Sequence, residues 1–260
     1  MSTEIMRRLM QAEEDERVRM LMAVESGSRS WGFESPNSDY DVRFVYAREP
    51  DWYLSVDLED KRDVIEYPIT DDIDMNGWDI RKALRLFWKS NPTIVEWIQS
   101  PVPYLEVGGF WSSMVELLPR TYSLAQGWHH YRSMANSNYR PFRGADQVSL
   151  KKYFYVLRPL LAVRWLEKRA TPAPIEFVRL LDLVEDEAAL HAIDELLEKK
   201  RASDEIAVGP AVPALNAFIE SELEQLESAK PPESKRTAEM DDLNALFRAV
   251  LEEGGMPPFR

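Results

Sequence analysis

The apolar positions of the first 120 residues change repeatedly between the spacing of a helix and that of a strand. Residues at helical spacing open the chain and predict an amphipathic helix that Ser2 or Thr3 could cap. Runs of strand length follow on both sides of a polar loop and again further along, and they predict one sheet. The predicted helix carries Ile5, Met6, Leu9 and Met10, and the predicted strands are Val18–Val24, Val42–Val45, Val64–Ile69, Ile73–Trp78 and Tyr104–Val107.

Helices are predicted between and after these strands. A helix over Trp78–Lys89 has apolar residues on one face and basic residues on another, and Asn91-Pro92 ends it. From Ser123 onward the pattern is almost wholly helical. The other predicted helices are Ile94–Ile98, Phe110–Leu118, Leu124–Tyr139, Val148–Arg169, Ile175–Leu183, Glu187–Arg201, Ala214–Ser228 and Thr237–Glu253.

This order of elements predicts an α+β protein. A small mixed-sheet domain, residues 1–119, is expected to end at Pro119, and an all-helical domain, residues 120–260, is expected to follow. A chain of 260 residues is long enough to bury a core in each of two modest domains.

The composition narrows the classes of function. The 32 Lys and Arg residues against 45 Asp and Glu give a net charge of −13, which opposes tight non-specific binding to a polyanion, so any contact with nucleic acid must be local. The absence of Cys excludes disulfides, zinc–thiolate sites and thiol nucleophiles. The charged start is unlike a signal peptide, and no apolar run has the length of a membrane span. We therefore expect a soluble, cytoplasmic protein.

The polar loop between the first two predicted strands carries the strongest candidate chemistry. Gly27 and Ser28 directly follow the first strand, where a residue without Cβ lets the backbone approach a ligand and free N–H groups can meet phosphate oxygens. Asp39 and Asp41 are two positions apart on the second strand, so both carboxylates share one face. Clustered carboxylates need a cation between them, and hard oxygen ligands suit Mg²⁺ bound to phosphates. Asp-x-Asp alone is ordinary turn chemistry, but joined to Gly-Ser it favours a metal–phosphate site.

This arrangement resembles the DNA polymerase β superfamily of nucleotidyltransferases, whose signature is a Gly-Ser pair, a spacer and an Asp-x-Asp strand. Ser28 and Asp39 are 39 − 28 = 11 positions apart, which fits the spacer. More narrowly, GSRSWGFESPNSDYDVRF followed by LRLFWKSNPTIVEWI is similar to the RlaP-type branch, which is associated with RNA repair. The resemblance extends through Tyr155. It implies an enzyme that transfers a nucleoside monophosphate from an NTP to a hydroxyl acceptor and releases pyrophosphate.

The resemblance also implies two metal ions, Mg²⁺ or Mn²⁺, held by Asp39, Asp41 and a third carboxylate on a later strand. Asp74 is at about the expected point, immediately before the helix Trp78–Lys89. Asp72 lies on the same face as Asp74, and Glu66 lies on a neighbouring strand, so either is an alternative. The local pattern is equally consistent with Asp74 as the cap of the next helix.

Cationic side chains are expected to meet the triphosphate. Arg43 shares the face of Asp39 and Asp41 and is expected either to pair with substrate charge or to orient these carboxylates. The helix Val148–Arg169 places Lys151 and Arg158 along one face, although a core helix whose basic residues extend to water is an equal alternative. The residues expected to bind the nucleotide are Gly27, Ser28, Arg29, Lys151, Lys152 and Arg158.

Two functions of other classes compete with nucleotidyl transfer. A Mn²⁺-dependent glycosyltransferase also uses Asp-x-Asp to hold a nucleotide-sugar diphosphate, although it does not need the upstream Gly-Ser. A non-catalytic module that binds a nucleotide or a protein, as one half of a toxin–antitoxin pair, is the second. The acceptor stays open among an RNA end, a small molecule and a protein hydroxyl, as do the base of the NTP and the oligomeric state.

Overall fold

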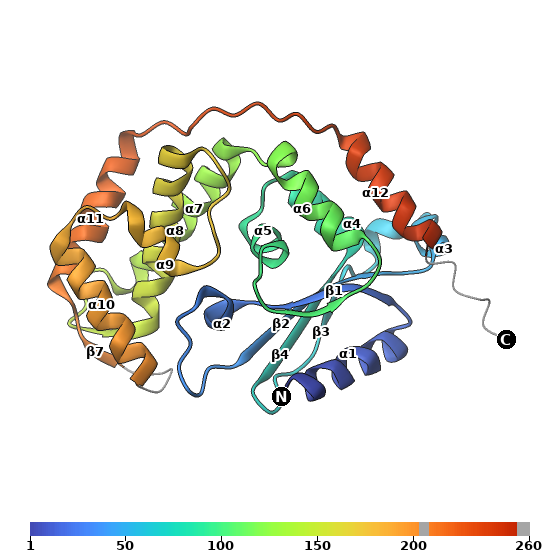
Figure 1. Cartoon of the computed structure of the whole chain (residues 1–260), viewed down its shortest axis with the longest axis horizontal. Helices are drawn as coiled ribbons and strands as arrows, with labels where there is room; N and C mark the ends of the chain where they lie inside the picture. Colours follow the sequence, from blue (N-terminus) through green and yellow to red (C-terminus); the bar gives the residue numbers. More distant parts are fainter. Residues whose placement is uncertain (203–207, 254–260) are drawn as a thin grey trace.

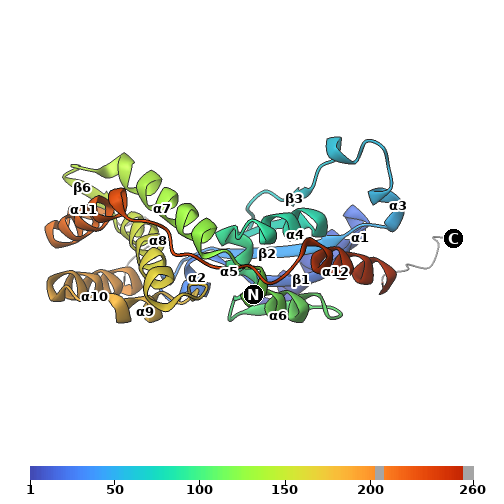
Figure 2. The ribbon, with the colours of Figure 1, turned by 90° about the horizontal axis from the view of Figure 1, so that it is seen from above.

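The computed structural model describes residues 1–202 and 208–253, and in it the chain forms two parts that lie side by side (Figure 1). The first part is a mixed five-stranded sheet with helices on both faces, and the second is a group of helices. The predicted α+β class is therefore confirmed. A short helix, α2 (Gly27–Trp31), lies between the two parts in both views of the ribbon (Figures 1 and 2).

The five strands are arranged in the order β3-β4-β2-β1-β5. β1 is antiparallel to β2 and to β5, β2 is parallel to β4, and β3 is antiparallel to β4. All five predicted strands are present, but the third ends early, because Pro68 cannot donate to a strand and the chain turns at Asp71 and Asp72, which have positive φ. The bounds are β1 Arg19–Glu25, β2 Tyr40–Ala47, β3 Val64–Glu66, β4 Ile73–Asp79 and β5 Pro103–Glu106.

Helices cover both faces of the sheet. The opening helix, α1 (Ser2–Glu16), packs Ile5, Leu9 and Ala12 on one face. The predicted cap at Ser2 or Thr3 is wrong, since Met1 precedes the helix and no side chain caps it. Met10 was expected on the buried face but is 61% exposed, because that face continues at Ala12. The other face is covered by α4 (Ile80–Trp88), α5 (Pro92–Ile98) and α6 (Phe110–Thr121).

The second part is helical, as predicted, with one addition. Strands β6 (Gln147–Ser149) and β7 (Val208–Pro210) form a small antiparallel pair that the sequence did not predict, because three residues are too few to show an alternation. The helices are α7 Leu124–Tyr139, α8 Leu150–Arg169, α9 Phe177–Leu180, α10 Glu187–Ala202 and α11 Pro213–Ser228. A single-turn helix, α3 (Pro50–Tyr53), follows β2.

The chain returns to the sheet after α11. Residues 229–239 run back along one side of the molecule, and α12 (Met240–Glu253) packs on α4 and α6 (Figures 1 and 2). The expected boundary residue Pro119 lies inside α6, which continues to Thr121. A continuous core also joins both parts, from Val24 in the sheet to Leu226 in α11. The division into residues 1–119 and 120–260 thus stays a prediction, and its second range includes positions outside the described residues.

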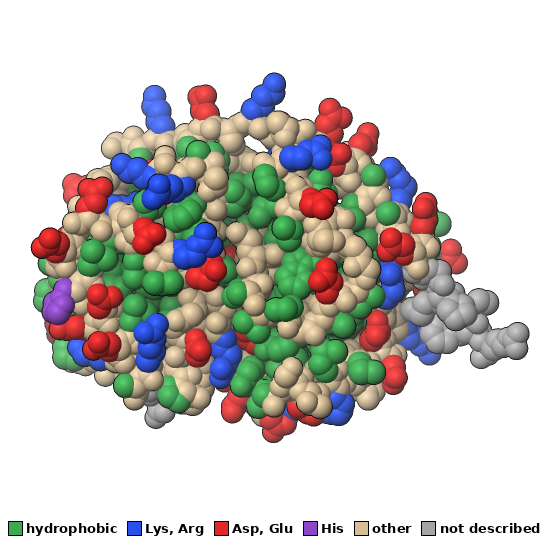
Figure 3. Space-filling view, in the orientation of Figure 1, with side chains coloured by type: hydrophobic (Ala, Val, Ile, Leu, Met, Phe, Trp, Pro, Cys, Tyr) green, Lys and Arg blue, Asp and Glu red, His purple; other side chains and the backbone are tan. Residues whose placement is uncertain are grey.

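The surface agrees with the acidic composition. On the face shown in Figure 3, Lys and Arg side chains are interspersed with Asp and Glu. No helix in the described ranges has both the length and the apolar character needed to cross a membrane.

Candidate active site

Two of the predicted carboxylates meet on neighbouring strands. Asp41 of β2 is directly opposite Asp74 of β4 in the parallel register. Both side chains lie on the sheet face opposite α1, because their neighbours Val42, Ile73 and Met75 pack into the core under that helix. The two side chains are about one-third exposed, at 29% and 30%. They therefore form an accessible pair that is fixed by the sheet.

Arg43 lies between these carboxylates. Its Nη2 donates to Asp41 Oδ1 at 2.8 Å and to Asp74 Oδ2 at 2.7 Å, and its Nη1 donates to the carbonyl of Asp74 at 2.9 Å. Because one nitrogen contacts both oxygens, the oxygens are at most about 5.5 Å apart, which is the sum of these two distances. A cation thus lies where two like charges would otherwise repel. In the free protein, Arg43 orients the pair, which is one of its two expected roles.

Asp39 has a different position. It precedes β2 and is exposed, and its backbone carbonyl accepts Arg29 Nε at 3.2 Å. Among the residues that the structure describes, no three His, Cys, Asp or Glu side chains lie close enough to form a metal site. The structure therefore brings together Asp41 and Asp74, and a joint role for Asp39 stays a prediction.

The alternatives to Asp74 have other surroundings. Glu66 accepts Arg62 Nη2 at 2.6 Å and Asn76 Nδ2 at 3.1 Å at the edge of the sheet. Asp72 lies in the exposed turn before β4. The capping alternative for Asp74 is wrong, because Asp79 caps α4 by accepting the backbone N–H of Arg81 at 2.8 Å.

Gly27 lies in contact with the carboxylate of Asp41. It begins α2 with φ +60°, and a Cβ added there would lie 2.0 Å from Asp41 Oδ2. The backbone N–H of the preceding Ser26 donates to the carbonyl of Asp41 at 2.8 Å. A residue with a Cβ could not approach so closely, and glycine also adopts the positive φ without strain. The predicted Gly-Ser turn therefore adjoins the carboxylate pair, with Ser28 in the first turn of α2.

A third carboxylate near the pair was missed from the sequence. Glu25 ends β1, is buried, and accepts the backbone N–H of Asp41 at 2.8 Å and the hydroxyl of Tyr104. Burial raises the pKa of Glu25. The available signal was a single acid at the end of an otherwise apolar strand, directly before Ser26 and Gly27.

Two of the cations that were predicted to bind the nucleotide have partners within the protein. Arg29 donates to the carbonyl of Ser38 at 2.7 Å and stacks on Tyr40, so it holds the loop before β2. Arg158 is buried, donates to Glu96 at 2.8 Å and lies over the ring of Trp31.

A cavity of about 280 Å³ lies between the two parts of the molecule, beside Asp41. Its wall includes Gly27, Asp41 and Arg43 from the sheet side, and Tyr155 and Arg158 from α8. Trp31 also lines it, with its ring edge-on to Tyr155 at 5.8 Å between centroids. Lys151 and Lys152 are not among its lining residues. The predicted α8 face therefore contributes Tyr155 and Arg158 to the cavity that Asp41 also lines.

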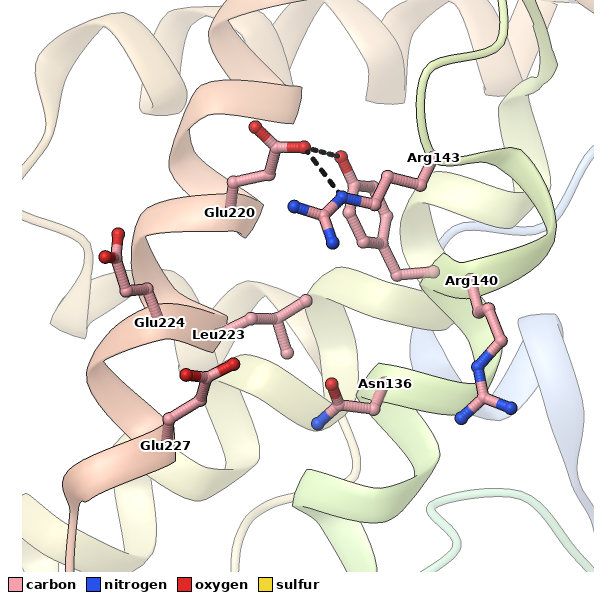
Figure 4. Close-up of a pocket in the computed structure, with 8 residues that line it drawn as sticks. Asn136, Arg140, Arg143, Glu220, Leu223, Glu224 and Glu227 are labelled. Atoms are coloured by element: carbon pink, nitrogen blue, oxygen red, sulfur yellow. Dashed lines mark hydrogen bonds and ion pairs between the residues drawn. The ribbon is translucent and has the colours of Figure 1, made fainter.

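A larger cavity of about 420 Å³ lies between α7 and α11 (Figure 4). Glu220, Glu224 and Glu227 line its α11 side. Glu220 accepts Tyr139 Oη at 3.0 Å and Arg143 Nε at 3.3 Å, and burial raises the pKa of Tyr139 to about 12. The three carboxylates outnumber Arg140 and Arg143 in this cavity, which disfavours a triphosphate there, so the smaller cavity is the better nucleotide site.

Comparisons with known proteins bear on the family of this chain. The family model RlaP, described as the RNA repair pathway DNA polymerase beta family, matches residues 1–249. The protein YcgL of Bacillus subtilis (strain 168), described as uncharacterized, is 40% identical over 255 residues, which are 97% of each chain. The crystal structure of a nucleotidyltransferase-like protein from Exiguobacterium sibiricum 255-15 matches 95% of this chain and 81% of that one, at 14% identity and a TM-score of 0.34. That structural likeness is too low to support an argument about the site.

Proposed function

Because the chain belongs to the RlaP family, the RNA repair pathway DNA polymerase beta family, it is a nucleotidyltransferase, and we propose that it transfers a nucleoside monophosphate from an NTP to the hydroxyl of an RNA end, with release of pyrophosphate. One observation carries the proposal. Asp41 and Asp74 lie opposite each other beside Gly27, and Asp41 and Gly27 line a cavity that also reaches α8. Fixed carboxylates and free N–H groups of a turn are what a metal-bound triphosphate requires.

The carboxylate pair fits Mg²⁺ or Mn²⁺. Mg²⁺ is commonly bound by one or two carboxylates together with water and substrate phosphates, so Asp41 and Asp74 suffice as its protein ligands. When bound, such ions would neutralise the phosphate charge and lower the pKa of the attacking hydroxyl. Asp39, just before β2, is the proposed further ligand.

The remaining residues of the cavity would position the nucleotide. The backbone N–H groups of Gly27 and Ser28 at the start of α2 are proposed to meet the outer phosphates. Arg43, which contacts both carboxylates, would offer its guanidinium to the phosphates beside them. The rings of Trp31 and Tyr155 offer apolar walls for the base.

Family membership also bears on the rival functions. A glycosyltransferase belongs to another family, so the matched family model argues against that alternative. A non-catalytic module would have no need for two partly exposed carboxylates that face each other, one of which lines a cavity. Nucleotidyl transfer is therefore the function that the site supports best.

The proposal is tested by following the α-phosphate. Each α-labelled NTP is incubated with the protein, Mg²⁺ or Mn²⁺, and RNA oligomers ending in a 3′-hydroxyl or a 3′-phosphate. We expect label on the RNA, and its dependence on the 3′-hydroxyl would identify the attacking group. Label on the protein or on an added small molecule instead would keep the reaction but replace the acceptor. No transfer from any NTP to any acceptor would contradict the proposal.

A further inference from the structure

Glu25 is a buried carboxylate that the proposed reaction does not use. It is 1% exposed, and both of its side-chain oxygens have partners on other strands. Oε1 accepts the backbone N–H of Asp41 on β2 at 2.8 Å, and Oε2 accepts the hydroxyl of Tyr104 on β5. The carbonyl of Glu25 accepts Ser100 Oγ at 2.6 Å. One residue thus joins three strands at the end of the sheet where Asp41 lies.

The hydrogen bond to Asp41 marks the point where the β1–β2 pairing ends. The paired residues run from Arg19 opposite Ala47 to Glu25 opposite Val42. Beyond Glu25 the chain turns into α2 at Gly27, and the N–H of Asp41 is met by the Glu25 side chain. Asp41 is therefore held twice before the chain forms the Gly-Ser turn: its carbonyl accepts the backbone N–H of Ser26 at 2.8 Å, and its N–H donates to the Glu25 side chain.

Burying a carboxylate costs free energy even when it is hydrogen-bonded, and an apolar side chain would pack at a strand end without this cost. The carboxylate therefore indicates a task besides packing. We propose that Glu25, held by Tyr104, is a positioning residue that fixes Asp41 and the turn at Gly27 relative to each other before the metal–nucleotide complex binds. The positioning is a property of the free protein, whereas its consequence for nucleotide binding rests on the proposed function.

The opposite end of the same sheet offers a matched control. Asp79 is a buried carboxylate at the end of β4 that accepts a tyrosine hydroxyl, Tyr53 Oη, at 2.7 Å and a backbone N–H, that of Arg81, at 2.8 Å. It lies opposite Tyr46 in the register, five residues along β2 from Asp41, which is about 17 Å at the usual strand rise. Replacing Asp79 removes the same kinds of contact without touching the carboxylate pair.

The first test measures hydrogen exchange of backbone amides in the full-length protein without nucleotide. Glu25→Ala is expected to raise exchange in peptides covering residues 26–30 and 39–43 by about tenfold or more, because the N–H of Asp41 loses its acceptor. Glu25→Gln keeps an oxygen acceptor and should restore most of the protection. Asp79→Ala should lower the melting temperature and leave these peptides unchanged. Unchanged exchange of residues 39–43 in Glu25→Ala would overturn the positioning role.

The second test titrates the magnesium complexes of the four NTPs into each variant by calorimetry. We expect Glu25→Ala to weaken binding of the preferred NTP at least tenfold, Glu25→Gln to weaken it about threefold or less, and Asp79→Ala to leave it unchanged. Equal losses in Glu25→Ala and Asp79→Ala would assign Glu25 to general stability and overturn the proposal. If the wild-type protein binds no NTP, the proposed function fails, and the exchange experiment still decides the role of Glu25.

Should Glu25→Ala not fold, Tyr104→Phe carries the same test, since it removes one support of Glu25 and leaves its contact with Asp41. It should raise exchange at residues 39–43 and weaken NTP binding about threefold. Tyr53→Phe is its matched control and should change neither. If Tyr104→Phe behaves like Tyr53→Phe in both measurements, the proposal is wrong.

Discussion

Gly27 and Asp41 are packed so closely that an added methyl group has no room between them. Gly27→Ala would place Cβ 2.0 Å from Asp41 Oδ2 and would also strain the positive φ. A displaced carboxylate can cost about 100-fold in rate, so we expect a turnover loss of that order, together with a stability loss of about 1 kcal/mol or more. Turnover and urea unfolding measure the two effects.

Gly32→Ala is the matched control for this substitution. Gly32 also has a positive φ, +85°, but a Cβ there meets nothing within 4 Å. This variant should therefore show the backbone strain and keep its turnover. Similar turnover in the two variants would mean that the approach of Gly27 to Asp41 has no catalytic importance.

Arg43 supplies the positive charge between the carboxylates in the free protein. In Arg43→Gln the pair has no cation between it, so we expect a lower melting temperature without metal and a larger rise on adding Mg²⁺ than in the wild type. The partial exposure of the carboxylates, about one-third, reduces the first effect through solvent screening. Thermal unfolding with and without Mg²⁺ measures both.

Arg62→Gln is a suitable control, because Arg62 pairs with the carboxylate of Glu66 at 2.6 Å on the exposed edge of the sheet. Its response to Mg²⁺ should match that of the wild type. If Arg43→Gln responds no more strongly than Arg62→Gln, the metal does not bind where the guanidinium lies.

At the residue scale, the sequence predicts those site residues whose signal lies in the residues next to them along the chain. Asp41 and Gly27 follow from the motif, and Asp74 from the point on a later strand where the family resemblance implies a third carboxylate. Glu25 was missed because its role depends on Asp41 and Tyr104, which are distant in sequence. Lys151 was predicted to bind the nucleotide but is not among the residues that line the cavity. Helical periodicity places residues on one face of a helix and does not show which turn of a long helix reaches a cavity.

The helix α4 depends on a buried acid at its start. Burial raises the pKa of Asp79 above its usual value of 3.8. The stability that this carboxyl contributes is fully present below the unfolded pKa and is lost as the pH rises through the folded pKa. Asn at this position has no ionisation, so the free energy of unfolding of Asp79→Asn relative to wild type should increase as the pH rises.

Urea unfolding of both proteins between pH 4 and pH 7 measures this difference. An unchanged difference across the range would show that Asp79 has the same pKa in the folded and unfolded chains, contrary to its burial.

At the element scale, long periodic segments were predicted well. The helices α7 and α10 and the strands β1, β2 and β4 lie within a few residues of their expected bounds. The elements that were missed are short. The five-residue helix α2 and the three-residue strands β6 and β7 depend on partners elsewhere in the fold, and such lengths show no period.

At the scale of the whole molecule, the segment of residues 229–239 ties the two parts together. Arg236 donates to the carbonyls of Thr121 at 2.7 Å and Trp88 at 2.6 Å, and its guanidinium lies 3.8 Å from the ring of Trp88. Arg236→Ala removes these contacts and should lower the free energy of unfolding by about 1–3 kcal/mol. Lys235→Ala, at an exposed neighbouring position, should change it by less than about 0.5 kcal/mol.

Equal stabilities of these two variants in urea unfolding would mean that the contacts of Arg236 do not help to hold the returning segment against α4 and α6. The sequence could not predict this return, because residues 229–239 have no periodic pattern and their partners lie more than a hundred positions away. A chain that ended near Pro119 would expose apolar surface, since it would lack the residues of α12 that pack on α4 and α6.

The proposed role of the Asp41–Asp74 pair is to hold the metal ions that nucleotidyl transfer requires. Its most direct test is the rate of pyrophosphate release at saturating NTP and Mg²⁺ for the wild type, Asp74→Asn and Asp72→Asn. We expect Asp74→Asn to lose about 1000-fold in kcat and Asp72→Asn to stay within about threefold of the wild type, because only Asp74 faces Asp41 across Arg43. Near wild-type release by Asp74→Asn, or an equal loss in Asp72→Asn, would contradict the claim.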